Sequence, residues 1–329
     1  MFLLAKFLLK NIFFRFFIIK FLYHFNSNIR MRIERVGKKI AIWNFHDKVK
    51  FDFKKLNLLF NKSCDILFLI DSDICEYYWI CKFFSQFNLL NHINNIDYST
   101  NDRIILIYND NKNIQFIKKF KKLHPSKKII LFHISDESCN HDISVYRYAD
   151  YIYRNHYSIS LFNKNVSIFP LGPNGDVFFN IKKPITKKYI FNFIGDINKP
   201  SRSFLLDQIN DLNFIYLHTY SGWLSNNMLP KNEYKKVLED SAFTIAPSGF
   251  YSAETFRFWE ALLSKSIPII FENNEYLFLI RYWGIENSVL YLDDMDKIKN
   301  IDFSCYFNTS EFNEFLLKLG LNFNETDKL

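Results

Sequence analysis

One stretch of the chain, residues 242–273, limits most strongly what the protein can fold into. It reads AFTIAPSGFYSAETFRFWEALLSKSIPIIFEN, and it predicts a strand, a Pro-Ser-Gly loop, a helix and a second strand. A loop that leads into a helix N-terminus binds anions, because free backbone N–H groups and the helix dipole both favour negative charge there. The block therefore predicts an α/β protein with a phosphate-binding site.

Apolar runs of strand length recur along the rest of the chain. In the first half of the chain their spacing of roughly 25–40 residues is typical of βα units around a parallel sheet. The expected strands are Ile40–Asn44, Ile66–Ile70, Ile104–Tyr108, Ile129–Ile134, Tyr189–Ile194, Phe214–His218, Ala242–Ala246, Ile267–Phe271 and Val289–Leu292. Helices are expected at Tyr77–Phe87 and Asn113–Leu123.

The breaker cluster Phe169–Gly175 divides this pattern into two halves. A chain of 329 residues, 49% of them hydrophobic, is long enough for two cores. We expect an α/β fold with two Rossmann-like, doubly wound domains at residues 28–168 and 169–310, facing a cleft. Ligands of such sheets bind beyond the carboxyl ends of the strands. A tail at 311–329 is expected to contain a helix over Glu311–Leu319.

The first 25 residues are apolar but are interrupted by Lys6, Lys10, Arg15 and Lys20. No charge-free run reaches the ~20 residues that a membrane-spanning helix needs. Residues 1–27 therefore predict a basic apolar helix in the membrane interface, with its cations extending to the headgroups. The alternatives are a helix packed on the protein itself and a signal anchor.

The formal charge of +8 favours an anionic partner, either a membrane surface or an anionic substrate. Nucleic acid is not expected, because the sequence has no zinc-finger or RNP-like motif. The five cysteines are odd in number and form no C-x-x-C pair, which is typical of free thiols in a reducing compartment. We expect a cytoplasmic protein that associates peripherally with the membrane.

Charged residues of the 242–273 block are spaced as in a site that binds a nucleotide diphosphate. If Ser252 caps a helix over Ala253–Ser264, Glu254 lies in its first turn, where acids suit the dipole. Arg257, one turn later, is placed to bind a diphosphate through both guanidinium nitrogens. Glu260 is placed to accept hydrogen bonds from ribose hydroxyls. The alternative interpretation is an ordinary solvated helix face.

The block resembles the C-terminal signature of exostosin-type glycosyltransferases, glycosyltransferase family 47. The matching segments are Glu233-Tyr234-Lys235, Asp240-Ser241-Ala242-Phe243, Pro247-Ser248-Gly249, Arg257, Glu260-Ala261-Leu262, Ile267-Pro268-Ile269, and upstream Phe193-Ile194-Gly195 with Arg202. The chain departs from the pattern at Ser248, where the family often has Arg, and at Lys265, where it has a small residue.

The resemblance implies a GT-B enzyme that moves a hexose or pentose from a nucleotide sugar, expected to be a UDP-sugar, to a glycan or glycolipid hydroxyl. It implies inversion at the sugar carbon without a bound metal or other cofactor, in polysaccharide biosynthesis. The C-terminal domain would hold the donor and the N-terminal domain the acceptor. The expected donor-binding residues are Gly195, Arg202, Pro247, Ser248, Gly249, Ser252, Glu254, Arg257 and Glu260.

Inversion by direct displacement needs a general base near the acceptor hydroxyl. The strand Ile129–Ile134 runs into Asp136 and Glu137, which places either acid for this role, although the pair could instead cap a helix. His133 is expected to be a core histidine. The segment His133–Glu137, with Tyr153–Tyr157, resembles the ribitol xylosyltransferase-like branch of these enzymes. Within it, Arg154 and His156 are expected to reach donor phosphates or acceptor across the cleft.

Three other functions compete with this hypothesis. Asp71-Ser72-Asp73 follows a predicted strand and matches the metal–diphosphate motif of a GT-A glycosyltransferase. Glu254 and Glu260 resemble the paired glutamates of retaining GT-B enzymes, at a shorter spacing. The basic N-terminus also fits a non-catalytic protein that binds membrane surfaces or polyanions.

Overall fold

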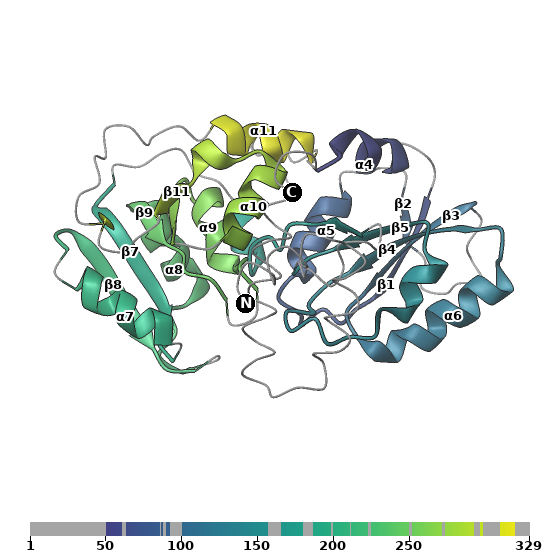
Figure 1. The fold of residues 1–329 in the computed structure, drawn as a ribbon, viewed down its shortest axis with the longest axis horizontal. Helices are drawn as coiled ribbons and strands as arrows, with labels where there is room; N and C mark the ends of the chain where they lie inside the picture. The colour runs from purple at the N-terminus through teal and green to yellow at the C-terminus, as the bar shows by residue number, and fades with distance from the viewer. Residues whose placement is uncertain are drawn as a thin grey trace, which may run out of the picture.

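The computed structural model describes residues 51–60, 64–85, 87, 90–92, 101–156, 166–179, 187–198, 200–210, 212–222, 225–249, 252–271, 274–292, 297–298 and 310–319. These residues form two parallel β-sheets, A and B, which lie side by side with helices around them (Figure 1). We refer to residues 51–168 as the A half and to residues 187–298 as the B half.

Sheet A has six strands in the order β2-β1-β3-β4-β5-β6, and every neighbouring pair is parallel. Buried side chains on both faces explain why these strands read as continuous apolar runs. The strands are β1 (Cys64–Leu69), β2 (Leu90–His92), β3 (Arg103–Tyr108), β4 (Lys128–His133), β5 (Tyr151–Arg154) and β6 (Val166–Ile168).

Sheet B has five parallel strands in the order β11-β10-β9-β7-β8. These are β7 (Tyr189–Asp196), β8 (Ile215–Tyr220), β9 (Ser241–Ile245), β10 (Ile267–Phe271) and β11 (Leu290–Leu292). Numbered within each half, the first five strands of both sheets follow the same doubly wound order, 2-1-3-4-5. The strand order therefore reverses between β1 and β3 in sheet A and between β7 and β9 in sheet B.

Helices cover both faces of each sheet. On the outer faces, α6 (Ile114–Leu123) and η3 (Ile143–Tyr148) pack on sheet A, and α7 (Pro200–Ile209) packs on sheet B. The inner core contains side chains of α4 (Phe53–Phe60), α5 (Tyr77–Ser85), α9 (Phe256–Leu263), α10 (Asn274–Trp283) and α11 (Ser310–Lys318). The remaining elements are α8 (Lys231–Glu239) and the short helices η2 (Asn111–Asn113), η5 (Asp176–Phe179) and η6 (Glu286–Ser288).

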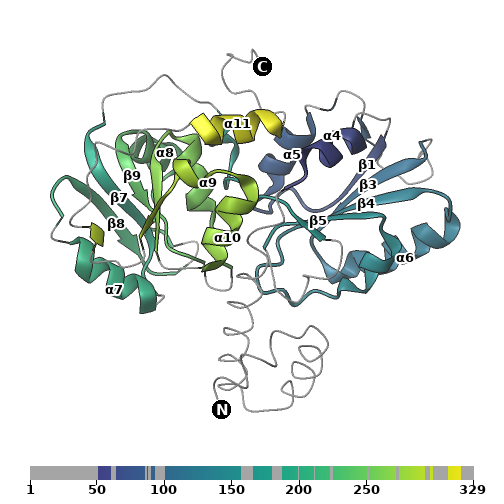
Figure 2. The ribbon, with the colours of Figure 1, turned by 45° about the horizontal axis from the view of Figure 1, so that its top comes forward.

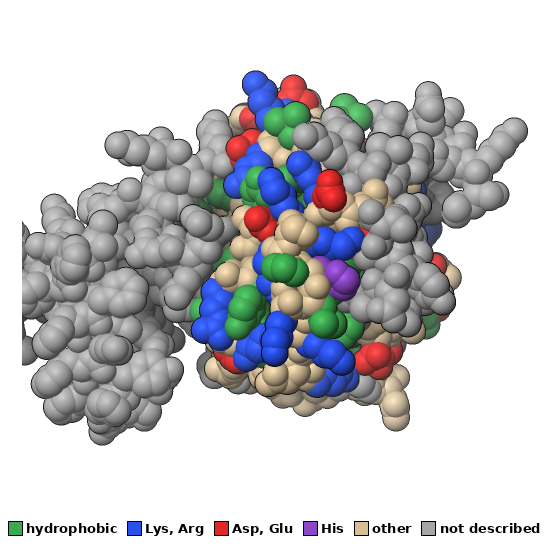
Figure 3. Space-filling view, turned by 90° about the vertical axis from the view of Figure 1, so that its right-hand side faces the viewer, with side chains coloured by type: hydrophobic (Ala, Val, Ile, Leu, Met, Phe, Trp, Pro, Cys, Tyr) green, Lys and Arg blue, Asp and Glu red, His purple; other side chains and the backbone are tan. Residues whose placement is uncertain are grey.

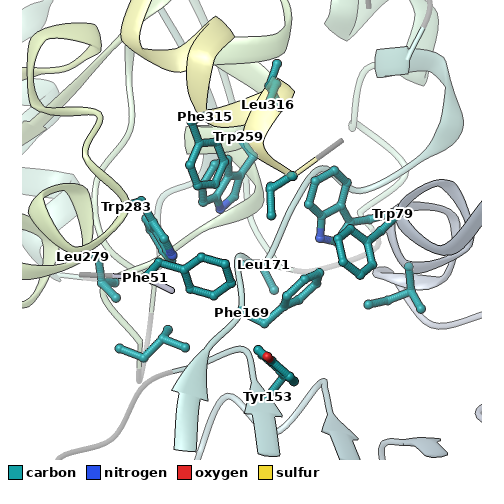
Figure 4. Close-up of a cluster of buried hydrophobic side chains, with 14 of the residues drawn as sticks. Phe51, Trp79, Tyr153, Phe169, Leu171, Trp259, Leu279, Trp283, Phe315 and Leu316 are labelled. Carbon is teal, nitrogen blue, oxygen red and sulfur yellow. The ribbon is translucent and has the colours of Figure 1, made fainter. Parts of the chain in front are cut away.

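A single aromatic core joins the two halves (Figure 4). The connection after β6 carries Phe169 and Leu171 into this core, and the Trp79 indole of α5 donates to the Pro170 carbonyl at 3.0 Å. From the other side, Trp259 of α9 stacks on Phe315 of α11 with ring centroids 5.6 Å apart. Because this apolar surface is continuous, burial in both halves stabilises their mutual placement.

The C-terminal helix contributes to the same junction. Phe315 of α11 contacts Phe53 of α4 edge to face, with ring centroids 5.8 Å apart. The two helices lie next to each other above the sheets in Figure 2. The predicted tail helix therefore exists and links the start of the described chain to the B half.

The predicted fold class is confirmed: two doubly wound α/β sheets, the arrangement of GT-B enzymes. Eight of the nine predicted strands and both early helices lie at the expected places, whereas β2, β5 and β6 were not predicted. The expected strand Ile40–Asn44 and the basic N-terminal helix lie outside the described residues. Within the described residues, no helix is long and apolar enough to cross a bilayer.

Candidate active site

The topological switch point of sheet B is the natural ligand position in this fold, because the loops after its two central strands diverge there. Strand β7 ends in Gly195 and Asp196, and the neighbouring β9 leads into Ala246 and the loop Pro247–Gly249. The family-like segments that were far apart in sequence thus meet at one edge. The B half holds its predicted donor loop at the position where doubly wound sheets bind ligands.

Arg257 extends over the end of β7. A Cβ on Gly195 would lie 2.1 Å from Nη2 of Arg257, so a side chain at this position would displace the guanidinium. The guanidinium also lies 5.2 Å from the ring centroid of Phe193, in cation–π geometry. Its Nε is buried and has no hydrogen-bond partner among the described residues. An unpartnered donor on a positive group at a switch point fits an anionic ligand.

Arg202 of α7 lies beside it. Its Nη1 donates to the Asp196 carbonyl at 2.9 Å and its Nη2 to the Ser248 carbonyl at 3.5 Å, which ties α7 to both loops. Burial and the positive charge of Arg257 lower the pKa of Arg202 to about 10. Arg202 still carries its charge at neutral pH, so two mutually repelling cations are held together. A diphosphate would relieve that repulsion.

The helix after the loop begins later than predicted. α9 starts at Phe256, and Thr255, in extended conformation, is its N-cap residue. Ser252 is therefore not the cap, and Glu254 does not lie in the first turn; both are buried in the segment before the helix. The shift arises because Glu254 is held elsewhere, by the Leu171 amide at 2.5 Å and the Trp259 indole at 2.6 Å.

Glu254 and Glu260 are interior side chains, so the solvated-face interpretation is wrong for both. Glu260 accepts from the Asn174 amide at 3.0 Å and the Tyr234 hydroxyl at 2.8 Å, which engages both of its oxygens. Burial raises the pKa of Glu260 and raises that of Glu254 to about 7. In this structure both carboxylates bind the connection between the halves rather than an open site.

At the carboxyl end of β4, Asp136 is locked in the interior of the A half. Its carboxylate accepts from Arg154 Nη2 at 2.8 Å and from the amides of Asn140 and His141. Arg154 is 2% exposed and also donates to the carbonyls of Asp136 and His156. The guanidinium predicted to reach across to the ligand is thus occupied inside the A half.

His133, Asp136 and His141 place three metal-ligand atoms within 4.8 Å of one another. Arg154 Nη1 lies 2.9 Å from His133 Nδ1, which must accept that bond, so the His133 proton is on Nε2. That N–H faces His141 Nδ1 at 3.0 Å. Burial and the charge of Arg154 hold the pKa of His133 well below its usual range. This hydrogen-bonded arrangement around a guanidinium does not fit a cation.

Glu137, the second predicted acid, points to the other half. Its Oε1 lies 2.8 Å from where a Cβ on Gly249 would be, so the glycine leaves space for the carboxylate. Glu137 is half-buried, unlike its neighbour Asp136. The acid after β4 in sheet A and the loop after β9 in sheet B therefore meet, as the prediction of a two-domain site requires.

The backbone around Glu137 adopts rare conformations. Ser135, Cys139 and His156 have φ of 62°, 55° and 54°, the left-handed region that non-glycine residues seldom occupy. Such strain persists where surrounding contacts impose it and is often found at functional sites. Here Asn155 accepts from the Ser135 amide at 3.0 Å, and Glu76 accepts from the Ser135 hydroxyl at 2.7 Å.

Two residues near the site were not predicted. Glu76, which precedes α5, is buried with its Oε1 3.7 Å from Nε2 of His156, which is itself 5% exposed. Tyr220 ends β8, next to the switch point; burial raises its pKa, whereas the charges of Arg257 and Arg202 lower it. Neither residue lies in a motif, and only strand order brings them here.

The acidic pair Asp71 and Asp73, the predicted metal–diphosphate motif, follows strand β1. Both side chains are exposed beyond β1, and Lys112 Nζ lies 3.8 Å from Asp71 Oδ2. Among the described residues, His133, Asp136 and His141 form the one cluster of possible metal ligands, and it does not include this pair.

Comparison with known proteins points to one family for part of the chain. Residues 178–276 match the family model of the RXYLT1 C-terminal domain, which covers 99 of the 329 residues. The match supports a glycosyltransferase in general. It does not include His133–Glu137 or Tyr153–Tyr157, on which the predicted likeness to the ribitol xylosyltransferase-like branch rested, and the exostosin assignment stays a prediction. No curated protein sequence matches the chain.

Solved structures show only distant likeness. An alpha1,3-fucosyltransferase is 13% identical and aligns over 78% of this chain and 89% of its own, with a TM-score of 0.37; its complex with GDP gives 0.39. TarM is 15% identical and aligns over 69% of this chain and 53% of its own, with a TM-score of 0.38. The fold assignment of this protein rests on the two sheets described above and not on these alignments.

Proposed function

We propose that this protein is a glycosyltransferase that moves a sugar from a nucleotide diphosphate sugar to a hydroxyl group, with inversion. One observation carries the proposal: two guanidinium groups lie at the switch point of sheet B, and an acid from sheet A faces the same loop. The match of this region to the RXYLT1 C-terminal domain supports it.

In the proposed donor complex, the diphosphate lies against Arg257, Arg202 and the backbone of Pro247–Gly249. Arg257 would supply the donor that is unpartnered in the described structure. Arg202 would act from its fixed position between the two loops. A UDP-sugar remains our predicted donor, since the exostosin-like motifs imply it.

The reaction would be a single displacement. Glu137 takes the proton of the acceptor hydroxyl, and the acceptor oxygen forms a bond to the anomeric carbon as the bond from that carbon to the diphosphate oxygen breaks. The diphosphate leaves with the electron pair, and the two arginines stabilise its added charge. The sequence did not distinguish Asp136 from Glu137 as the candidate base. In the proposed mechanism, Asp136 instead fixes the loop.

The acceptor in this proposal is a glycan or glycolipid, in keeping with a cytoplasmic enzyme held at the membrane surface by residues 1–25. The reaction as written uses no metal, because the arginines neutralise the leaving group. These assignments extend the sequence-based predictions, and each is open to direct measurement.

Calorimetric titration with UDP, with and without EDTA, tests the donor site. We expect UDP to bind in EDTA and the affinity to fall about 10- to 100-fold in Arg257→Ala, the range of one charge-assisted contact. Gly195→Ala should weaken binding similarly, because its Cβ displaces the Arg257 guanidinium. The exposed Arg281 gives a matched control, Arg281→Ala, with no expected change.

Binding that requires Mn²⁺ and ignores Arg257 would overturn the proposal and return attention to Asp71 and Asp73. If UDP fails to bind, GDP and other nucleotides are tested with the same variants. Equal loss in Arg257→Ala and Arg281→Ala would mean that only net charge matters, and no specific donor site exists there.

A further inference from the structure

The outer end of the A half carries a dense positive surface. Residues 111–128, which form η2, α6 and the entry to β4, contain seven Lys and one His and no acidic residue. Figure 3 views the molecule from this end, and Lys and Arg side chains gather on the face. In Figure 1, α6 lies at the opposite end of the molecule from β7 and β9, which lead into the predicted donor loop.

Part of this positive charge is used by the fold. Lys121 Nζ donates to the Lys127 carbonyl at 2.7 Å, and Lys127 Nζ donates to the Asn101 carbonyl at 2.6 Å. Lys112 lies within ion-pair distance of Asp71 and Asp110. Lys118 is half-buried, and its charge, after the hydrogen bonds from Ser144, lowers the pKa of Asp142. Three exposed lysines have no such role among the described residues, and we call them the α6 basic surface: Lys119, Lys122 and Lys128.

Fold stability alone does not account for the α6 basic surface. Lys119 and Lys122 are three residues apart on one helix, where side chains are neighbours and like charges repel. Among the described residues, no acidic side chain lies within ion-pair distance of these three lysines. The helix dipole favours cations only in the last turn, so it does not explain Lys119 or Lys128. An anionic partner would reduce the repulsion among these lysines.

An apolar side chain stands among these charges. α6 packs Ile114, Ile117 and Phe120 on sheet A, yet Leu123 at its C-terminal end is 60% exposed. Lys119 precedes Leu123 by four residues and shares its side of the helix. Lysines around an exposed apolar side chain match a bilayer interface, where headgroups bind the ammonium groups and the acyl boundary receives the leucine.

We propose that the α6 basic surface docks on an anionic lipid bilayer, giving the A half a membrane contact of its own. The contact is independent of the proposed chemistry and of the predicted N-terminal helix. A soluble polyanion would also find positive charge here, but it would leave Leu123 in water. An anionic bilayer therefore accounts for both the lysines and the exposed Leu123 of this face.

Vesicle co-sedimentation of the full chain tests the proposal, with vesicles of phosphatidylglycerol mixed with phosphatidylcholine and vesicles of phosphatidylcholine alone. Each lysine near an anionic surface is worth about 1 kcal/mol, so Lys119→Gln/Lys122→Gln should weaken partitioning roughly 25-fold at low ionic strength. Leu123→Ser should weaken it by a smaller factor that salt does not change. Phosphatidylcholine alone should bind none of the variants appreciably.

The matched control is Lys54→Gln/Lys265→Gln, which removes the same charge from two exposed lysines away from α6. Thermal unfolding of each variant checks that the fold is kept. A loss confined to the α6 variants supports the proposal. It is overturned if both double variants weaken equally, if the full chain ignores anionic vesicles, or if only binding to soluble heparin depends on Lys119 and Lys122.

Discussion

The two halves of the molecule share one topology but carry opposite chemistry at corresponding edges. The first five strands of both sheets follow the order 2-1-3-4-5, and the acid after β4 of sheet A meets the loop after β9 of sheet B. The B half presents Arg202 and Arg257 there, held by backbone carbonyls and a glycine. The A half presents Glu137, carried by a loop that Asp136 and Arg154 fix. The shared topology determines where these loops lie, and their side chains determine whether the edge carries positive or negative charge.

The two halves also differ in the groups that surround a buried acid. Asp136 in the A half has a guanidinium 2.8 Å away. Among the described residues, the hydrogen-bond donors to Glu254 in the B half are an amide and an indole. Burial raises the pKa of a carboxyl group, and for Glu254 it raises the pKa to about 7. This difference makes the halves respond differently to mutation and to pH.

The largest expected effect comes from removing the acid that faces the B half. Glu137→Gln should lower kcat about 100- to 10,000-fold, since it removes the proposed general base. UDP affinity should stay within about twofold, because the arginines are untouched. Steady-state kinetics with the donor selected by binding, beside calorimetry, gives both numbers. Unchanged kcat in Glu137→Gln would mean that the base is another residue.

Removing the other acid of the A half should instead act on stability. Asp136→Ala leaves Arg154, 2% exposed, without its carboxylate, which costs about 3–5 kcal/mol of unfolding free energy. Denaturant unfolding measures the loss, with Glu137→Gln as the matched control and an expected change below about 0.5 kcal/mol. If the two variants are equally stable, the proposed division of roles between the acids fails.

The smallest effect is a change with pH in the B half. Glu254 loses its proton near pH 4.5 when unfolded and near 7 when folded. Between these values the folded state binds more protons, so the unfolding free energy falls as pH rises, by up to about 3 kcal/mol. Urea unfolding across that window should show a shallower fall in Glu254→Gln.

Glu260 contributes in the same direction, because burial raises its pKa too, so some slope should remain in Glu254→Gln. The signature is therefore the difference in slope between the wild type and the variant. Identical slopes would show that Glu254 has the same pKa in the folded and the unfolded protein. That result would remove the contrast with Asp136.

The sequence by itself determined the α/β class, the two-part organisation and most strands, because buried parallel strands must be short apolar runs between breaker residues. It missed β5 (Tyr151–Arg154), in which polar Arg154 obscures the apolar pattern, and the three-residue strands β2 and β6. It placed the start of α9 at Ala253 rather than Phe256, since no local rule shows that Glu254 is held by Leu171 and Trp259.

Only the tertiary structure decided which charged residues meet. Gly195 and Arg257 are 62 positions apart, and Glu137 and Gly249 are 112 apart, yet each pair is in contact. Strand order determines these distances, and the sequence pattern of a strand does not encode its neighbours. In the same way, only the structure separated Asp136 from Glu137. Adjacent residues on one loop point in different directions, one towards a buried guanidinium and the other towards the facing half of the molecule.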